Sequence, residues 1–278
     1  MAIPTERKAP LRRLRLPVLL VGTAALLIIA RGLDALVSGV PVLRFSIGLG
    51  AAIGAIFAYT WLSRQVENRV EVTELAAAGR WSGLGRGALL GAGAFLATML
   101  LAALCTDIDV TSGSFGACLG VAGSMASVAV TEELLFRGVV HRILEERTGS
   151  IVAIAVSSLI FGLIHLLNPG ATLWGSLTIA VEGGALLAIA YTVTRSLWLP
   201  IGLHFAWNFT ESGVFGTAVS GADVEPGLLR TVLSGPDLLT GATFGPEASL
   251  FALLCCLVPA VWLLRDAKLV ARRPRAAR

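Results

Sequence analysis

Charged residues are scarce in this chain: Asp, Glu, Lys and Arg make up only 14% of its 278 residues. A soluble globular domain is about 25% charged, so this scarcity excludes an ordinary soluble domain. Hydrophobic residues instead make up 55% of the sequence, and the mean hydropathy is +0.80. This composition is typical of a polytopic integral membrane protein.

Cysteine is also rare, and the four cysteines, Cys105, Cys118, Cys255 and Cys256, lack the spacing of a metal site. We interpret them as small apolar packing residues, with a disulfide between Cys105 and Cys118 as an unsupported alternative. The sequence has no phosphate-binding glycine loop, internal repeat or separate soluble domain. Its cations gather at the termini and in alternate loops, which indicates membrane topology rather than nucleic-acid binding.

Apolar runs of about 17–25 residues are long enough to cross a bilayer as helices. Eight such runs predict an all-α bundle of about eight transmembrane helices, forming a single transmembrane domain over residues 1–278. The predicted spans are 17–36, 45–63, 87–105, 115–141, 151–167, 172–194, 197–215 and 248–264.

The lysines and arginines predict the orientation, because they favour the cytoplasmic side of short loops. With both termini in the cytoplasm, all but three of the 22 cations lie on the inner side or at inner helix ends. The exceptions are Arg31, Arg44 and Arg230. We therefore expect basic cytoplasmic tails at 1–16 and 265–278. The Ala-, Gly-, Leu- and Arg-rich composition favours a bacterial inner membrane.

The segment 127–140 holds two adjacent carboxylates and an arginine among apolar residues. Ionised groups within a membrane usually face the protein interior and indicate a functional site. Glu133 and Arg137 lie four residues apart in the order that favours an ion pair, so we interpret Glu133 as a structural counter-ion. Glu132 is rotated by about 100° and lacks a local partner. An unpaired carboxylate in a low dielectric is a natural general base or metal ligand.

Two of the three histidines also lie inside predicted spans. Phe161 lies one helical turn before His165, and His204 shares a helix face with Asn208. Antiparallel packing can bring these residues together with Glu132 from three separate helices. Burying several ionisable groups costs roughly 5–10 kcal/mol before pairing, which is comparable with the net stability of a domain. We therefore predict a shared active or transport site.

The chemistry that suits these groups is hydrolysis. Glu132 can take a proton from water that His165 holds, while His204 and Asn208 donate hydrogen bonds to an oxyanion. In a second scheme, Glu132, His165 and His204 hold a divalent metal such as zinc. The residues serve either scheme. A non-catalytic membrane scaffold and a proton-coupled transporter are alternatives, although a transporter predicts repeat symmetry that is absent.

Three motifs occur in order on three spans: Glu132-Glu133-x-x-x-Arg137, Phe161-x-x-x-His165 and His204-x-x-x-Asn208. They resemble the signature motifs of the CPBP family, also called the Abi or type II CAAX prenyl endopeptidase family. The resemblance covers a core of about 121–210. It implies an eight-helix intramembrane protease whose cavity opens to the cytoplasmic leaflet.

In this resemblance, Glu132 and His165 activate water, His204 and Asn208 support the oxyanion, and Glu133, Arg137 and Phe161 have supporting roles. The family is usually described as metalloproteases, although a metal-independent glutamate mechanism has been argued. The implied partner is a membrane-tethered or transmembrane protein or peptide substrate in the lipid bilayer. Because bacterial members are also linked to bacteriocin self-immunity, an immunity-type protein is the alternative.

Several further features carry expectations of their own. We interpret Glu182 as an interior acid, with a cavity-lining role as the alternative, and His141 as an interfacial residue. The inner segment 64–86 is predicted to be a surface helix or a solvated linker. The outer segment 211–247 is predicted to be a lid or a linker. Small-residue motifs predict close packing inside the bundle at Gly50/Gly54, Gly87/Gly91 and Gly116/Gly120.

Overall fold

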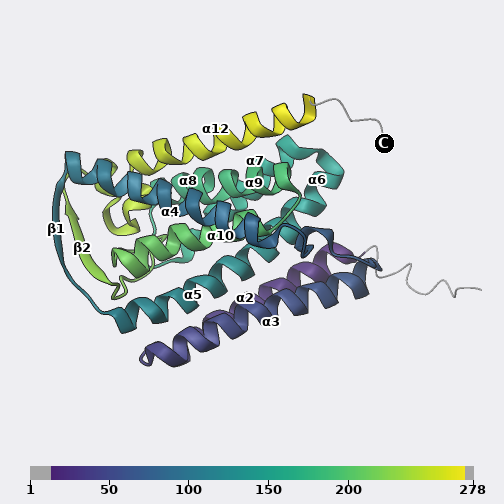
Figure 1. The fold of residues 1–278 in the computed structure, drawn as a ribbon, viewed down its shortest axis with the longest axis horizontal. Helices are drawn as coiled ribbons and strands as arrows, with labels where there is room; N and C mark the ends of the chain where they lie inside the picture. Colours follow the sequence, from purple (N-terminus) through teal and green to yellow (C-terminus); the bar gives the residue numbers. More distant parts are fainter. Residues whose placement is uncertain (1–13, 273–278) are drawn as a thin grey trace, which may run out of the picture.

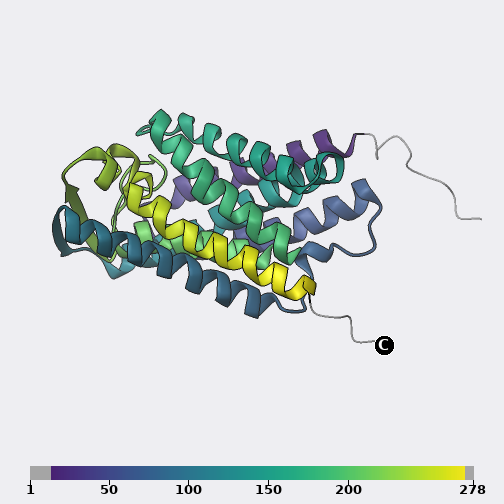
Figure 2. The ribbon, with the colours of Figure 1, turned by 90° about the horizontal axis from the view of Figure 1, so that it is seen from above.

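The protein is an elongated bundle of helices that run roughly along its long axis (Figures 1 and 2). The computed structural model describes residues 14–272, with side chains through residue 266, so the predicted basic tails lie largely outside the described residues. A two-stranded sheet lies at one end of the bundle, which we call the sheet end. Helices α2 (Arg15–Val37) and α12 (Leu250–Arg272) begin and finish, respectively, at the opposite end, which we call the terminal end.

The predicted spans coincide with helices or continuous helical runs, with boundaries that differ by a few residues. Among the described residues, six of these runs are long and apolar enough to cross a membrane, and the all-α polytopic membrane fold is confirmed. The predicted spans 197–215 and 248–264 are not among the six. The first runs after α2 are α3 (Pro41–Glu67) and α4 (Arg80–Cys105), followed by α5 (Phe115–Glu133), which continues through the π-helical η2 (Leu134–His141) into α6 (Arg142–Thr148).

The second half of the bundle contains shorter helical pieces. Helix α7 (Ser150–Ile164) ends in a 3-10 turn, η3 (His165–Leu167). The next run comprises α8 (Leu173–Ile179), the π-helical η4 (Ala180–Leu186) and α9 (Leu187–Thr194). Helix α10 (Trp198–Asn208) then continues as the π-helical η5 (Phe209–Val214), and α12 lies alongside α4 and η4.

The sheet end carries a two-stranded ribbon that the sequence did not predict. Strand β1 (Asp107–Ser112) pairs antiparallel with β2 (Leu229–Ser234), so that Asp107 lies opposite Ser234. Short turns follow in α11 (Asp237–Thr240), η6 (Ala242–Phe244) and η7 (Pro246–Ala248). The segment 211–247 is therefore an ordered cap and not a simple linker. All four cysteines are free, so the alternative of a disulfide between Cys105 and Cys118 is not realised in this structure.

The closest helix contacts depend on glycine. A Cβ added at Gly91 of α4 would lie 2.2 Å from the Leu203 carbonyl oxygen of α10, and one at Gly87 would lie equally close to the Leu199 oxygen. The predicted close packing of Gly87 and Gly91 inside the bundle is thus confirmed. Gly54 differs, because a Cβ there would meet nothing within 4 Å among the described atoms.

We expect Gly91→Leu to lower the melting temperature of the detergent-solubilised protein strongly. The added side chain must push α4 away from α10, and overpacking a tight contact costs about 1–3 kcal/mol or more. Gly54→Leu is the matched control, because its side chain enters open space beside α3. Equal melting temperatures for the two variants would contradict the contact between α4 and α10.

The loop between α3 and α4 is largely exposed but is anchored to the bundle at Val72 and Glu74, so it is neither the predicted surface helix nor a fully solvated linker. It contains only a 3-10 turn, η1 (Thr73–Leu75), and the Glu74 side chain is 2% exposed. Tyr59 and Arg69 each donate a hydrogen bond of 2.7 Å to Glu74 Oε1, while Leu197 N donates to the Glu74 carbonyl oxygen at 2.8 Å. A buried carboxylate that is fully paired can anchor a loop that carries little apolar surface.

Glu74 predicts a pH-dependent stability. Burial by itself raises the pKa of Glu74, but the hydrogen bonds from Arg69 and Tyr59 outweigh it and hold the pKa below the usual 4.5. A lowered folded-state pKa contributes stability above the unfolded value, and that contribution is lost as the pH falls through the folded value. We expect Glu74→Gln to lower the melting temperature at pH 7, with a gap from wild type that narrows below about pH 4.5. Exposed Glu71→Gln serves as the control, and a gap that does not depend on pH would refute this account.

Candidate active site

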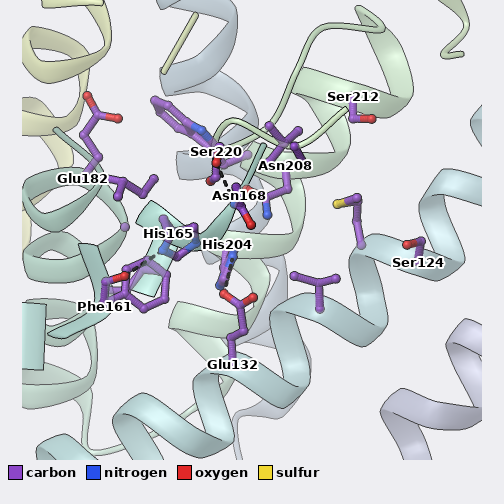
Figure 3. A pocket seen from close by; sticks show the side chains of 18 of the residues that line it. Ser124, Glu132, Phe161, His165, Asn168, Glu182, His204, Asn208, Ser212 and Ser220 are labelled. Atoms are coloured by element: carbon purple, nitrogen blue, oxygen red, sulfur yellow. Dashed lines mark hydrogen bonds and ion pairs between the residues drawn. The ribbon is translucent and has the colours of Figure 1, made fainter. Parts of the chain in front are cut away.

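Three helical runs bring Glu132, His165, His204 and Asn208 to the wall of one cavity (Figure 3). Glu132 lies at the end of α5, His165 directly after α7, and the other two on α10. Glu132, His204 and Asn208 are 6–7% exposed, so they reach the cavity while lying inside the bundle. The empty space of the cavity, counted together with the open solvent at its mouth, is about 870 Å³.

A buried ion pair lies directly beneath these residues. Arg137 Nη1 donates to Glu133 Oε1 at 2.7 Å, and the two side chains are 1% and 0% exposed. The second nitrogen of the guanidinium donates to the carbonyl oxygens of Gly183 and Gly184 on η4. The guanidinium carbon also lies 4.7 Å from the centre of the Phe161 ring, at a distance typical of a cation–π contact. The pair therefore joins three helical runs.

His204 connects this ion pair to Glu132. Its Nδ1 lies 2.9 Å from Glu133 Oε1, and its Nε2 lies 3.9 Å from Glu132 Oε2. An ionised carboxylate only accepts hydrogen bonds, so Nδ1 carries the proton in this contact and Nε2 faces the cavity. Glu133 is thus both a counter-ion and the group that orients His204. The sequence interpretation had given it only the first of these roles.

His165 is oriented by the helix that it ends. Its Nδ1 lies 2.7 Å from the carbonyl oxygen of Phe161, which can only accept, so in the neutral ring Nε2 is left with a free lone pair. The Phe161 ring centre lies 4.8 Å from that of His165 and 6.2 Å from that of His204. Phe161 is therefore the apolar spacer between the two imidazoles and the buried Arg137.

Each π-helical stretch lies beside a residue of the site. One begins directly after Glu133, another contains Glu182, and the third begins directly after Asn208. A π turn inserts an extra residue into the helical repeat and is frequent at functional sites. Side chains before and after each turn therefore face directions that a regular 3.6-residue repeat does not give.

Part of the chain that carries these residues matches a known protein family. Residues 113–210 match the family model described as Rce1-like, type II CAAX prenyl endopeptidase Rce1-like. This segment, which is less than half of the chain, is similar to that family. The matched residues include all three motifs, so the match supports a CAAX-protease-like intramembrane endopeptidase at family level. A comparison with curated proteins gives no match.

The cavity of this Rce1-like segment has a further wall that no motif predicted. Asn168 Nδ2 donates to the carbonyl oxygen of Ser220 at 2.7 Å, and Ser220 N donates to Glu247. Trp207 Nε1 donates to the same carboxylate at 3.3 Å. Ser220 has φ of +51°, a sparsely populated conformation for a residue with a side chain. Burial raises the pKa of Glu247, although the hydrogen bond from Ser220 opposes that shift.

Two other polar residues, Glu182 and His141, lie deep inside the bundle. Glu182 is 3% exposed and lines the cavity, and neither of its carboxylate oxygens has a partner among the described residues. Glu182 therefore follows the alternative interpretation, in which it lines the cavity. His141 is fully buried and not interfacial, since its ring nitrogens lie 3.2 Å from Ser157 Oγ and 3.0 Å from Thr192 Oγ1. Hydroxyl partners on neighbouring helices make this burial acceptable.

The donor set does not fit a metal site with three protein ligands. Within residues 14–272, no group of three or more His, Cys, Asp or Glu side chains is arranged to hold a metal ion. Glu132 Oε2 and His204 Nε2 are 3.9 Å apart, whereas ligand atoms about 2.0–2.1 Å from one tetrahedral zinc lie roughly 3.3 Å apart. We therefore derive no step through a metal.

We expect Arg137→Met to destabilise the protein by about 3–5 kcal/mol, because it leaves Glu133 as an uncompensated buried charge. Adding Glu133→Gln should restore part of that loss, since the double variant has no unpaired charge. The measurement is a double-mutant cycle of unfolding in detergent. Simple additivity of the two single effects would show that the side chains are not coupled.

Proposed function

We propose that the chain is an intramembrane endopeptidase that hydrolyses peptide bonds of membrane-tethered or transmembrane proteins with water activated by Glu132 and His165. The observation that carries this proposal is the placement of Glu132 Oε2 opposite His204 Nε2, 3.9 Å apart on the wall of one cavity. A carboxylate and oriented imidazoles at this separation can share a water and a substrate carbonyl between them.

Glu132 acts as the general base. The free lone pair of His165 Nε2 accepts one hydrogen of the water, and Glu132 takes the other proton as the water oxygen attacks the carbonyl carbon. Glu132 then returns this proton to the nitrogen of the leaving amine when the C–N bond breaks. The products are a carboxylic acid and an amine, and no serine or cysteine nucleophile takes part.

His204 and Asn208 stabilise the oxyanion. The side-chain amide of Asn208 has no hydrogen-bond partner among the described residues, so it is free to donate to a ligand. His204 uses its Nδ1 proton on Glu133, so its donation to the oxyanion comes from Nε2 and uses a second proton on the ring. Glu133, Arg137 and Phe161 support the reaction by holding His204 and His165 in place.

The proposed setting is a bacterial inner membrane with both termini in the cytoplasm. The distribution of cations supports this orientation, because all but Arg31, Arg44 and Arg230 fall on one side. The membrane-spanning helices support a substrate that is itself held in or at the bilayer.

The test is cleavage of a peptide library, including prenylated CAAX ends, by detergent-solubilised protein with mass-spectrometric detection. We expect Glu132→Gln to abolish cleavage and Asn208→Ala to lower kcat about 10²–10³-fold, the usual effect of losing one oxyanion donor. Exposed Glu71→Gln controls for loss of a carboxylate remote from the cavity. Unchanged cleavage by the Glu132 variant would exclude the proposed base.

Chelation separates the two chemical schemes. We expect cleavage to survive exhaustive treatment with a zinc chelator, because every step above uses side chains of the chain itself. Loss of cleavage on chelation, with recovery on adding zinc, would instead favour a metal held by Glu132, His165 and His204. If wild type and the Glu132 variant are both folded and neither cleaves any peptide, the non-catalytic scaffold or immunity-type function is favoured.

A further inference from the structure

The cavity extends along the bundle from Glu132 to the sheet end. From Glu132 its wall follows α5 through Val128, Met125 and Ser124, each closer than the last to Phe115 at the sheet end. At that end the lining passes to α2, α3 and the loop after η5, where it includes Arg31, Asp34, Arg44, Asp223 and Glu225. Arg31 and Asp223 are exposed, so the cavity reaches the surface there.

The opposite direction is closed. Between the site and the terminal end, the interior is filled by one hydrophobic cluster whose buried members include Tyr59, Leu134, Val139, Ile143, Leu197 and Ile201. Beyond this cluster lies the anchored loop between α3 and α4, with Glu74 bound to Tyr59 and Arg69. None of the described residues of this loop lines the cavity.

The mouth is built around a fixed arginine. Arg44 is 6% exposed and donates to the two oxygens of Asp34 at 2.8 and 2.7 Å. It also donates to Glu225 at 2.8 Å and to Ser124 Oγ at 3.3 Å. These bonds join α2, α3, α5 and the loop after η5 around the entrance. The mouth is therefore an ordered opening and not a gap left by loose loops.

The cations of the chain assign this mouth to a side of the membrane. Among residues 14–272, the terminal end carries the arginines of the α3–α4 loop, α6 and the α9–α10 turn, whereas the sheet end carries only Arg31, Arg44 and Arg230. Lysine and arginine favour the cytoplasmic side of short loops. The sheet end, and with it the mouth of the cavity, is then the outer end.

We propose that the active site is entered from the outer side of the membrane, so that its substrate is a membrane-anchored polypeptide whose cleaved segment lies on the non-cytoplasmic side. The substrate class rests on the proposed endopeptidase function, but the route of entry does not. It is opposite to the cytoplasmic opening that the family resemblance implies. Prenylated cytoplasmic tails are consequently not the substrate of this chain.

The test is the accessibility of single cysteines to a membrane-impermeant maleimide, in the full chain with the four native cysteines replaced by alanine. Met125→Cys probes the cavity wall. Asp109→Cys marks the sheet end, Glu71→Cys marks the terminal end, and Val121→Cys is a buried position on α5 outside the cavity. Each variant is labelled in intact cells and in inverted membrane vesicles.

We expect Met125→Cys and Asp109→Cys to be labelled in intact cells, Glu71→Cys only in inverted vesicles, and Val121→Cys in neither. Labelling of Met125→Cys only in inverted vesicles would overturn the proposal, as would its labelling from neither side while both end markers react. Exchange of the two end markers would overturn it through the orientation. Because labelling needs no catalysis, outer labelling in a protein that cleaves no peptide would refute the protease and leave the route of entry intact.

Discussion

The buried contact between Glu133 and Arg137 is the constraint on which the site depends. Each charge would be costly inside an apolar bundle, and each is compensated only while the helices keep their places. Arg137 holds the backbone carbonyls of Gly183 and Gly184 and packs over Phe161, while Glu133 holds His204. The contacts that compensate the charges of Glu133 and Arg137 therefore also hold both histidines in position.

Adjacent residues on one helix have opposite environments here. Glu133 has no exposed surface and is fixed by Arg137 and His204, whereas Glu132 reaches the cavity and has only the 3.9 Å contact with His204. Because successive helical residues point about 100° apart, one carboxylate can be structural while its neighbour stays available for proton transfer. The paired acid provides the rigidity, and in the proposed mechanism the unpaired acid is the general base.

The sequence could predict those features that depend on the helical periodicity of nearby residues. The eight helical runs and the i, i+4 relation of Glu133 and Arg137 follow from hydropathy and from positions on one helix. The cavity wall formed by Asn168 and Ser220, with Glu247 behind it, does not, because its contacts join loops far apart in sequence and have no motif. The pairing of β1 with β2 and the burial of His141 escaped prediction for the same reason. The π-helical turns break the very repeat on which such predictions rely.

The ribbon at the sheet end also orders the assembly of the protein in time. β1 follows α4, but its partner β2 follows η5, so the six-residue ladder cannot form until the intervening spans have been synthesised. Long separations along the chain make such pairings slow to form. During biogenesis, all residues of the three sequence motifs are therefore present before the ribbon forms. The ribbon is a late contact that fixes the sheet end of a nearly assembled bundle.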